Sequence, residues 1–244
     1  MSKKTVKKII RLVLVPLVIF DYWRFKMLDK ERRFAMNLKD IYPCVKDKTI
    51  STGFDRHYVY HTAWAARKVR EINPKFHIDI SSSLYFSSIV SAFVPVKFYD
   101  YRPADLNLSG LESGRCDLSA LPFADDSVGS ISCMHTVEHV GLGRYGDSID
   151  PDGDIKAIRE LKRVVARGGF LIFVVPVGGK PMIEFNAHRV YSYEQVLSYF
   201  SDFELKEFSL IPEYGEKGGI VANATKEMAD EEKYGCGCFL FIKH

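Results

Sequence analysis

The chain has 244 residues, of which 47% are hydrophobic and 13% aromatic. Such a chain can bury one large core, which excludes disordered, collagen-like and coiled-coil proteins. Lys and Arg number 34 against 31 Asp and Glu, and the formal net charge is +3. Residues 1–33 hold ten of the basic residues and three of the acidic ones. A nucleic-acid-binding protein would carry its basic excess on the folded domain, so we expect no nucleic acid partner.

The N-terminal segment combines this basic charge with an apolar stretch. Residues 9–20 are apolar apart from Arg11 and follow four lysines. This stretch is too short for a bilayer-spanning helix, which needs about 20 residues, and no signal-peptide cleavage site precedes Asp21. We therefore expect a helix in the membrane surface, with Tyr22 and Trp23 at headgroup depth. The alternative is a helix packed on the domain's own core or on a second copy of the chain.

The next region is predicted to be helical before strands and helices alternate. We expect residues 26–70 to be mainly helical, because apolar side chains recur at helical spacing from Tyr58 to Arg70 and Pro74 follows. Runs that are apolar on both faces then indicate parallel strands covered by helices. These runs lie at residues 76–80, 96–99, 128–134 and 170–177.

The C-terminal half completes an alternating pattern. Residues 154–165 read as an amphipathic helix, and residues 203–210 and 236–243 read as strands that close one edge of the sheet. The sequence predicts an α/β fold, doubly wound and Rossmann-like, with a mostly parallel sheet, an antiparallel C-terminal edge and an N-terminal helical extension. The expected parts are a basic apolar helix at residues 1–25 and an α/β domain at residues 26–244.

The five cysteines indicate a reducing compartment. Their number is odd, and none belongs to a C-x-x-C motif. Cys236 and Cys238 form a close pair, and on a strand both side chains would face the same side. We interpret them as free thiols in a reducing cytosol. Together with the N-terminal segment, this predicts a cytoplasmic protein that is peripheral at the inner face of the membrane.

Polar residues follow the predicted parallel strands. In an open α/β sheet, ligands bind outside the carboxyl ends of the strands. The first run ends near Asp79, before three consecutive serines, and Asp100 ends the second run. A carboxylate at this second position can accept hydrogen bonds from both hydroxyls of a ribose. Asp117 and Leu118 follow in a loop that could place an acid and an apolar side chain against an adenine.

Two longer runs resemble the class I S-adenosylmethionine-dependent methyltransferases. These runs are DLSALPFADDSVGSISCMHTVEHV and AIRELKRVVARGGFLIFVVPV, and this resemblance covers roughly residues 76–177. More narrowly, HYVYHTAWAARKV, HIDISSS, SCMHTVEHVGLGRYGD and FNAHRVYS resemble domain of unknown function 268, an uncharacterised bacterial and nematode family, over about residues 54–210. Its bacterial members are often associated with surface-polysaccharide assembly, so the resemblance implies a sugar or lipid-linked sugar as substrate.

The resemblance also implies S-adenosylmethionine as the cofactor. The methionine part of the cofactor would face Asp79, Ser81 and Ser83, and its ribose would face Asp100. Its adenine would lie against Asp117 and Leu118. Its methyl group would lie near His135. The superfamily's first loop is rich in glycine, whereas this loop consists of serines. A catalytically inactive fold that serves as a scaffold in a glycan-assembly complex is therefore one alternative. A transferase that uses another nucleotide-bearing donor is a second, since Asp100 would suit any ribose.

Methyl transfer to a hydroxyl requires in-line positioning and a base that takes the proton. We predict His139 and His188 as bases, with Glu138 as the acid beside them, because three of the seven histidines fall within residues 135–188 beside an acid. The predicted substrate-binding residues are Arg144 and Tyr145, in a glycine-flanked loop that suits a lid, and Asn186 and Arg189, in a later polar cluster.

Residues 135–139 (HTVEH) also match the H-x-x-E-H pattern of one class of zinc protease. No third ligand is evident, and the methyltransferase-like run already accounts for these residues, so we expect no metal site. Divalent-metal assistance through Glu138 or Asp147 is an alternative.

These observations predict an O-methyltransferase that uses S-adenosylmethionine to methylate a hydroxyl of a sugar or lipid-linked glycan during surface-polysaccharide biosynthesis. The N-terminal helix would hold the enzyme beside a lipid carrier at the membrane surface. A homodimer is a further possible assembly.

Overall fold

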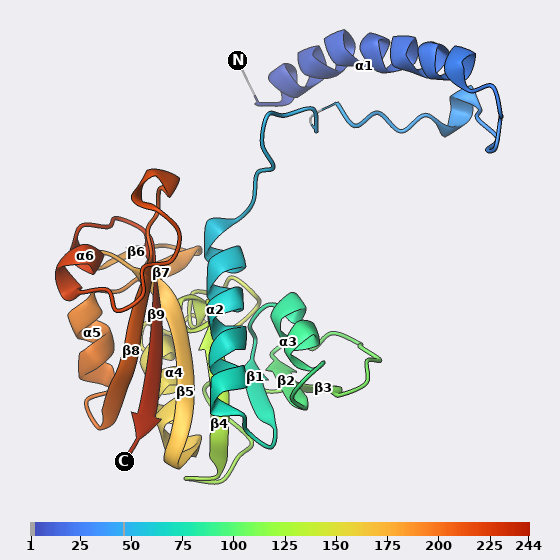
Figure 1. Cartoon of the computed structure of the whole chain (residues 1–244). Helices are drawn as coiled ribbons and strands as arrows, with labels where there is room; N and C mark the ends of the chain where they lie inside the picture. The colour runs from blue at the N-terminus through green and yellow to red at the C-terminus, as the bar shows by residue number, and fades with distance from the viewer. Residues whose placement is uncertain (1–2, 46) are drawn as a thin grey trace. The chain divides into compact units, whose positions relative to one another are not determined.

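The computed structural model describes residues 3–45 and 47–244 (Figure 1), and it describes side chains from residue 15 onward except at positions 46 and 217. The chain divides into two compact units, residues 1–54 and residues 55–244. We call the second unit the α/β domain. The predicted boundary after residue 25 stays a prediction.

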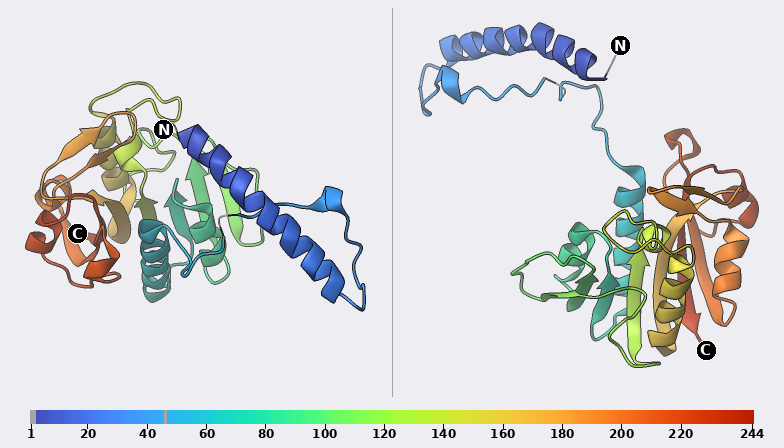
Figure 2. Two further views of the ribbon diagram at one scale, coloured as in Figure 1. Left: turned by 90° about the horizontal axis from the view of Figure 1, so that it is seen from above. Right: turned by 180° about the vertical axis from the view of Figure 1, so that it is seen from behind.

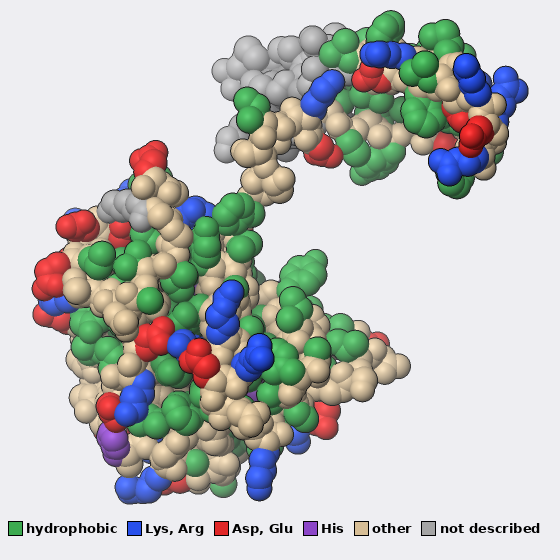
Figure 3. All heavy atoms as spheres, viewed as in Figure 1, with side chains coloured by type: hydrophobic (Ala, Val, Ile, Leu, Met, Phe, Trp, Pro, Cys, Tyr) green, Lys and Arg blue, Asp and Glu red, His purple; other side chains and the backbone are tan. Residues whose placement is uncertain are grey.

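The predicted N-terminal helix is present as α1 (Lys3–Leu28). Apolar side chains on its described part are exposed, among them Leu17 at 57% and Phe20 at 65%. Hydrophobic and basic side chains share the visible surface of this helix (Figure 3). The lysine side chains that precede the apolar stretch lie outside the described residues. Within the described chain, no helix combines the length and apolarity needed to cross a membrane.

The segment after α1 corrects the expectation that residues 26–70 are mainly helical. Between residues 29 and 55, the described chain contains one short 3-10 helix, η1 (Leu38–Asp40). No described side chain in this segment is buried, and Pro43 lacks the N–H that a helix interior needs. A helix there would have no apolar face to bury, and tertiary packing is what stabilises most helices in proteins.

The α/β domain is built around a seven-stranded sheet with the order β3-β2-β1-β4-β5-β9-β8. Its strands are β1 (His77–Ile80), β2 (Val96–Asp100), β3 (Leu111–Arg115), β4 (Val128–Met134), β5 (Val165–Val177), β8 (Phe203–Ile211) and β9 (Gly235–Lys243). Strands β1 to β5 run parallel to one another, whereas β9 is antiparallel to both β5 and β8. The predicted fold class is therefore confirmed, including its antiparallel C-terminal edge.

The register brings segments that are distant in the sequence to the same end of the strands. Ile80 at the end of β1 pairs with Tyr99 on β2 and with Cys133 on β4. Cys236 near the start of β9 pairs with Pro176 near the end of β5. Because β9 is antiparallel, its first residues lie at the end of the sheet where the parallel strands have their carboxyl ends.

Helices cover both faces of the sheet and bury an apolar cluster on each. Helices α2 (Arg56–Ile72) and α3 (Leu84–Val90) cover one face (Figure 1), and α4 (Gly153–Val164) and α5 (Tyr193–Tyr199) cover the other (Figure 2, right). The remaining elements are η2 (Val137–His139), the hairpin of β6 (Met182–Glu184) and β7 (His188–Val190), η3 (Gly215–Lys217) and α6 (Lys226–Asp230).

Candidate active site

A cavity of about 400 Å³ opens at the carboxyl ends of the parallel strands. Its wall includes Ser81 after β1, Asp100 at the end of β2 and Thr136 after β4. The loop that follows β3 adds Asp117 and Leu118. This first cavity therefore occupies the strand ends at which α/β folds bind ligands.

Two of the predicted carboxylates in this wall are held by short-range hydrogen bonds. Oδ1 of Asp100 accepts a bond of 2.7 Å from the backbone N–H of Arg102. Oδ1 of Asp117 accepts bonds from the N–H and the hydroxyl of Ser119, at 2.8 and 2.6 Å. Each aspartate is thus oriented through one oxygen, and its Oδ2 can accept a hydrogen bond from a ligand hydroxyl or amino group.

The serine loop makes its turn without glycine. Ser81 has a φ of 55°, in the left-handed region, and its N–H donates to the carbonyl of Tyr99 at 2.7 Å. The Ser82 hydroxyl accepts from the Met134 N–H at 3.2 Å, which ties the loop to β4. Ser83 precedes α3 with a φ of −69° and is not among the residues that line the cavity. The backbone therefore adopts the turn that glycine favours, at the cost of local strain at one serine.

Asp79 is fully buried and is not among the residues that line either cavity. Its carboxylate accepts hydrogen bonds from the hydroxyls of Ser132 on β4, at 2.5 Å, and of Ser87 on α3. Burial outweighs these bonds and raises the pKa of Asp79 to about 6. The structure thus places Asp79 inside the network that joins β1, β4 and α3, behind the ligand-facing residues.

A second cavity of about 440 Å³ adjoins the first. The two cavities have four residues in common: Tyr58, His135, His139 and Tyr145. The rest of the second wall is polar and aromatic and consists of Asp55, Arg56, His57, Glu138, Arg144, His188, Glu213 and Tyr234. Two ligands bound in these cavities would therefore meet at a shared wall.

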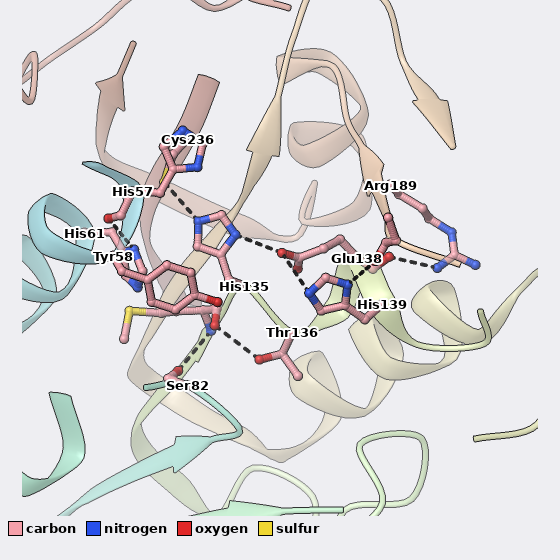
Figure 4. Close-up of polar contacts among 12 residues, drawn as sticks. His57, Tyr58, His61, Ser82, His135, Thr136, Glu138, His139, Arg189 and Cys236 are labelled. Carbon is pink, nitrogen blue, oxygen red and sulfur yellow. Dashed lines mark hydrogen bonds and ion pairs between the residues drawn. The ribbon is translucent and has the colours of Figure 1, made fainter. Parts of the chain in front are cut away.

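His135 belongs to this shared wall and lies at the centre of a polar cluster (Figure 4). Its backbone has a φ of 52°, and its Nδ1 lies 2.9 Å from Oε1 of Glu138. A carboxylate oxygen only accepts, so the Nδ1–H of His135 donates and Nε2 faces Sγ of Cys236 at 3.4 Å. Oε2 of Glu138 is buried and has no hydrogen-bond partner among the described residues.

His139, one of the predicted bases, is held in one orientation between the cavities. Its Nδ1–H donates to the carbonyl of Ala187 at 2.6 Å, so the neutral ring carries its lone pair on Nε2. That nitrogen lies 3.8 Å from Oε1 of Glu138. Burial lowers the pKa of His139 below its ordinary value of 6.5. The ring is therefore neutral at pH 7 and can accept a proton beside a carboxylate.

His188, the other predicted base, lines the second cavity but not the first. Its ring lies 4.8 Å from that of Tyr234 and 6.5 Å from that of His139, between centroids. Its Nε2 is 3.6 Å from Oε2 of Glu184. The structure thus brings both predicted bases and Glu138 to one cavity, with His139 nearer to the first.

The glycine-flanked loop after η2 covers both cavities through Tyr145. The guanidinium carbons of Arg102 and Arg144 lie 4.8 and 5.1 Å from the centroid of the Tyr145 ring. The Asp147 carboxylate accepts from the N–H of Gly141 at 2.7 Å, and also from those of Gly143 and Tyr145. Asp147 therefore shapes the loop, which presents Tyr145 and Arg144 to the cavities.

The two remaining predicted substrate ligands lie elsewhere. Arg189 is 5% exposed, and its guanidinium donates to the carbonyls of Val140 and Pro151, at 2.7 and 3.2 Å. Asn186 donates to the carbonyl of Leu142 at 3.2 Å. Neither residue is among those that line the cavities. Both donate to carbonyls of the chain between η2 and α4, and their role in substrate binding stays a prediction.

Helix α2 supplies site residues that the sequence analysis did not assign to the site. His57 and Tyr58 line the second cavity, and Tyr58 stacks on His135 with ring centroids 5.5 Å apart. His61, one turn after His57, lies with its ring 5.0 Å from that of His135. The signal that could have found them is a pair of histidines one turn apart on an otherwise apolar helix face.

The chain is similar to known proteins in sequence over part of its length and in fold. The family described as "Caenorhabditis protein of unknown function, DUF268" matches residues 124–223. The Bacillus subtilis YcgJ protein has a similar structure, with 14% identity, a TM-score of 0.52, and coverage of 76% of this chain and 99% of that one. No curated protein matches the chain.

Two further structures are similar. One is described as the complex between the Haloferax volcanii Trm112 methyltransferase activator and the putative methyltransferase, with 17% identity, a TM-score of 0.52, and coverage of 78% and 90%. The other is a putative sarcosine dimethylglycine methyltransferase from Galdieria sulphuraria, with 11% identity, a TM-score of 0.52, and coverage of 74% and 84%. The α/β domain has the class I methyltransferase fold. The predicted resemblances to this superfamily and to DUF268 are confirmed.

Proposed function

We propose that the chain is an S-adenosylmethionine-dependent methyltransferase whose first cavity binds the cofactor and whose second cavity binds the acceptor. The observation that carries this proposal is the wall that the two cavities have in common. The two cavities adjoin at these shared residues. A methyl group held there by the cofactor would lie close to an acceptor in the second cavity, as an in-line transfer requires.

The first cavity offers hydrogen-bonding groups and an apolar side chain that suit the cofactor. Asp100 presents an oriented carboxylate to a ribose, and Asp117 with the buried Leu118 presents an acid and an apolar side chain to an adenine. The turn at Ser81 brings backbone to the cavity wall despite the missing glycines. Bound there, S-adenosylmethionine supplies an activated methyl group on a sulfonium.

The second cavity suits a hydroxyl-bearing acceptor. Nε2 of His139 accepts the proton of the acceptor hydroxyl, and the carboxylate of Glu138 at 3.8 Å stabilises the resulting imidazolium. Aromatic rings such as Tyr58 and Tyr234 offer faces to an apolar surface, while Arg144 and Glu213 offer charged hydrogen-bonding groups. This mixture favours a sugar with acidic or phosphate substituents, which includes lipid-linked glycans of surface-polysaccharide biosynthesis.

The proposed location is the inner face of the membrane, where the enzyme would be peripheral. Exposed apolar side chains on α1, including Trp23 at 46%, lie beside basic ones such as Lys26, whose Nζ is 5.4 Å from the Trp23 ring. A helix with this composition binds the headgroup region of anionic membranes. It would place the acceptor cavity near a lipid carrier.

A transfer assay tests this proposal. The full-length protein is incubated with S-adenosylmethionine carrying a labelled methyl group and with lipid-linked or free sugars, and labelled sugar is measured. We expect His139→Gln to lower kcat about 100-fold or more while cofactor binding is kept, since general bases contribute on that scale. His244→Gln, at the exposed C-terminal histidine, is the matched control. Activity of the wild type should fall only below about pH 6.5, because the pKa of His139 is lowered.

Cofactor binding without transfer to any sugar would overturn the sugar acceptor and leave a methyltransferase of another class. Full activity in His139→Gln would remove that residue as the base. A folded protein that binds no cofactor would instead support the scaffold or another nucleotide-bearing donor.

A further inference from the structure

Three groups that can bind a metal converge beside the second cavity. They are His57 on α2, His135 after β4 and Cys236 on β9, and their ligand atoms all lie within 4.8 Å of one another. Figure 4 shows the three residues next to one another, and Nε2 of His135 lies 3.4 Å from Sγ of Cys236. All five cysteines of the chain are free thiols. Three elements far apart in the sequence thus deliver two imidazoles and a thiol to one point.

The cluster has more hydrogen-bond acceptors than donors. The Nδ1–H of His135 donates to Glu138, which leaves the lone pair of the neutral ring on Nε2. The Nδ1–H of the neighbouring His61 donates to the carbonyl of His57 at 2.6 Å, so Nε2 of His61 carries a second lone pair. That atom is buried and without a hydrogen-bond partner in the described part of the chain. The Cys236 S–H is a single weak donor, and a cation would balance the excess of lone pairs.

We propose that His57, His135 and Cys236 bind a divalent metal ion of the zinc class. Two imidazoles and one thiolate are the ligands that such borderline-soft ions prefer. A tetrahedral zinc site separates nitrogen and sulfur ligands by about 3.6 Å, given bond lengths of about 2.0 to 2.3 Å. The observed 3.4 Å between His135 and Cys236 is close to that edge, and His57 needs a shift of about one ångström to join them.

The surroundings match those of known metal sites. A carboxylate that accepts from the far nitrogen of a metal-binding histidine fixes its tautomer, which is the relation of Glu138 to His135. His57 and His135 both line the second cavity, so the fourth coordination position faces that cavity. On binding, Cys236 forms a metal–sulfur bond and releases its proton to solvent. A role for the ion in orienting an acceptor oxygen rests on the proposed function, whereas ion binding does not.

This ligand set differs from the H-x-x-E-H pattern considered in the sequence. In the structure, His135 and His139 both approach Oε1 of Glu138, at 2.9 and 3.8 Å, and His139 is not part of the cluster. This proposal therefore replaces the expectation from the sequence that the chain has no metal site.

Cobalt titration tests the site directly. The full-length protein is freed of metal with a chelator, the chelator is removed, and Co²⁺ is added while absorption spectra are recorded. We expect one equivalent of Co²⁺ to bind with the visible bands of a tetrahedral site and a near-ultraviolet thiolate-to-cobalt charge-transfer band. Zn²⁺ should displace the cobalt, and each equivalent bound should release one proton. A folded protein that shows no bands would overturn the proposal.

Variants identify the ligands. Cys236→Ser should abolish the charge-transfer band, and both Cys236→Ser and His57→Gln should weaken Co²⁺ binding at least tenfold, with circular dichroism confirming that they fold. Cys133→Ser is the matched control, since Cys133 is equally buried on β4 but is not one of the clustered ligands. A charge-transfer band that survives in Cys236→Ser, or that is lost in Cys133→Ser, would contradict the assignment. Calorimetry with S-adenosylhomocysteine, run separately without metal, keeps this result distinct from the proposed function.

Discussion

Ser81 occupies a left-handed backbone conformation at the turn where related folds place glycine, with a φ of 55°. Replacing it by glycine removes steric strain of about 1 to 2 kcal/mol and adds about 0.5 to 1 kcal/mol of chain entropy to the unfolded state. We predict that Ser81→Gly raises the free energy of unfolding by about 0.5 kcal/mol, measured by urea denaturation. Ser83→Gly is the control, because Ser83 has a φ of −69° and should only lose stability. Equal losses in both variants would refute this explanation.

Asp79 makes stability depend on pH. Its pKa in the folded protein is raised to about 6, against about 3.9 in an unfolded chain. Between these values the folded state retains a proton that the unfolded state has lost, so stability falls as pH rises. Over this window the contribution amounts to about 3 kcal/mol.

We predict that Asp79→Asn removes this dependence. The difference in unfolding free energy between wild type and variant, measured in urea at about pH 4 and pH 7, should change by about 2 kcal/mol in favour of the wild type at low pH, since pH 4 already lies at the pKa of the unfolded chain. Parallel stability profiles for the two proteins would show that Asp79 does not titrate in this range.

The loop between η2 and α4 is the element that shapes both cavities, and its glycines differ in what they permit. A Cβ at Gly141 would lie 2.0 Å from the carbonyl oxygen of Asp150, whereas a Cβ at Gly146 would meet nothing within 4 Å. Both have a positive φ, at 81° and 87°. Gly146→Ala therefore measures backbone strain alone, and Gly141→Ala adds a steric clash.

We predict that Gly141→Ala lowers the free energy of unfolding by at least 2 kcal/mol, about twice the loss in Gly146→Ala. Gly141→Ala should also weaken cofactor binding, because Tyr145 would be displaced from the shared wall. Urea denaturation and calorimetry measure these effects. Similar losses of stability in the two variants would show that the close approach at Asp150 is unimportant.

The sequence predicts some elements well because their patterns are local. Strands β4 and β5 are long apolar runs, and α4 has a clear amphipathic stripe, so their positions agree with expectation. Strand β3 (LESGR) has one buried residue at the edge of the sheet and carries no such pattern. The helical interpretation of residues 26–70 is wrong over residues 29–55, where apolar residues occur without a surface to pack on.

The site residues also differ in how far the sequence could predict them. Asp100 and Asp117 could be predicted because parallel strand ends define one edge. The cluster of His57, His135 and Cys236 could not, since it depends on how α2 and the antiparallel β9 meet that edge. The sequence could not predict that Arg189 is buried and bonds to backbone carbonyls, because a buried arginine has the same local sequence as one that lines a cavity.

At the scale of the whole chain, the N-terminal unit and the α/β domain are predicted to have separable roles. Deleting residues 1–25 should abolish binding to anionic lipid vesicles, measured by cosedimentation, while S-adenosylhomocysteine affinity stays unchanged. Binding of the full-length protein should weaken as salt is added, because basic residues contribute to it. Vesicle binding that persists after deletion would refute a membrane role. Loss of dimerisation instead would favour packing on a second copy.

Titration of the full-length protein with S-adenosylhomocysteine by isothermal calorimetry tests the central claim most directly, because the proposed methyl transfer requires a cofactor bound in the first cavity. We predict micromolar binding with one site per chain. Asp100→Ala should weaken it at least tenfold, while the exposed Asp105→Ala should bind as the wild type does. A folded wild-type protein that shows no binding at millimolar ligand would contradict the assignment of this cavity to the cofactor.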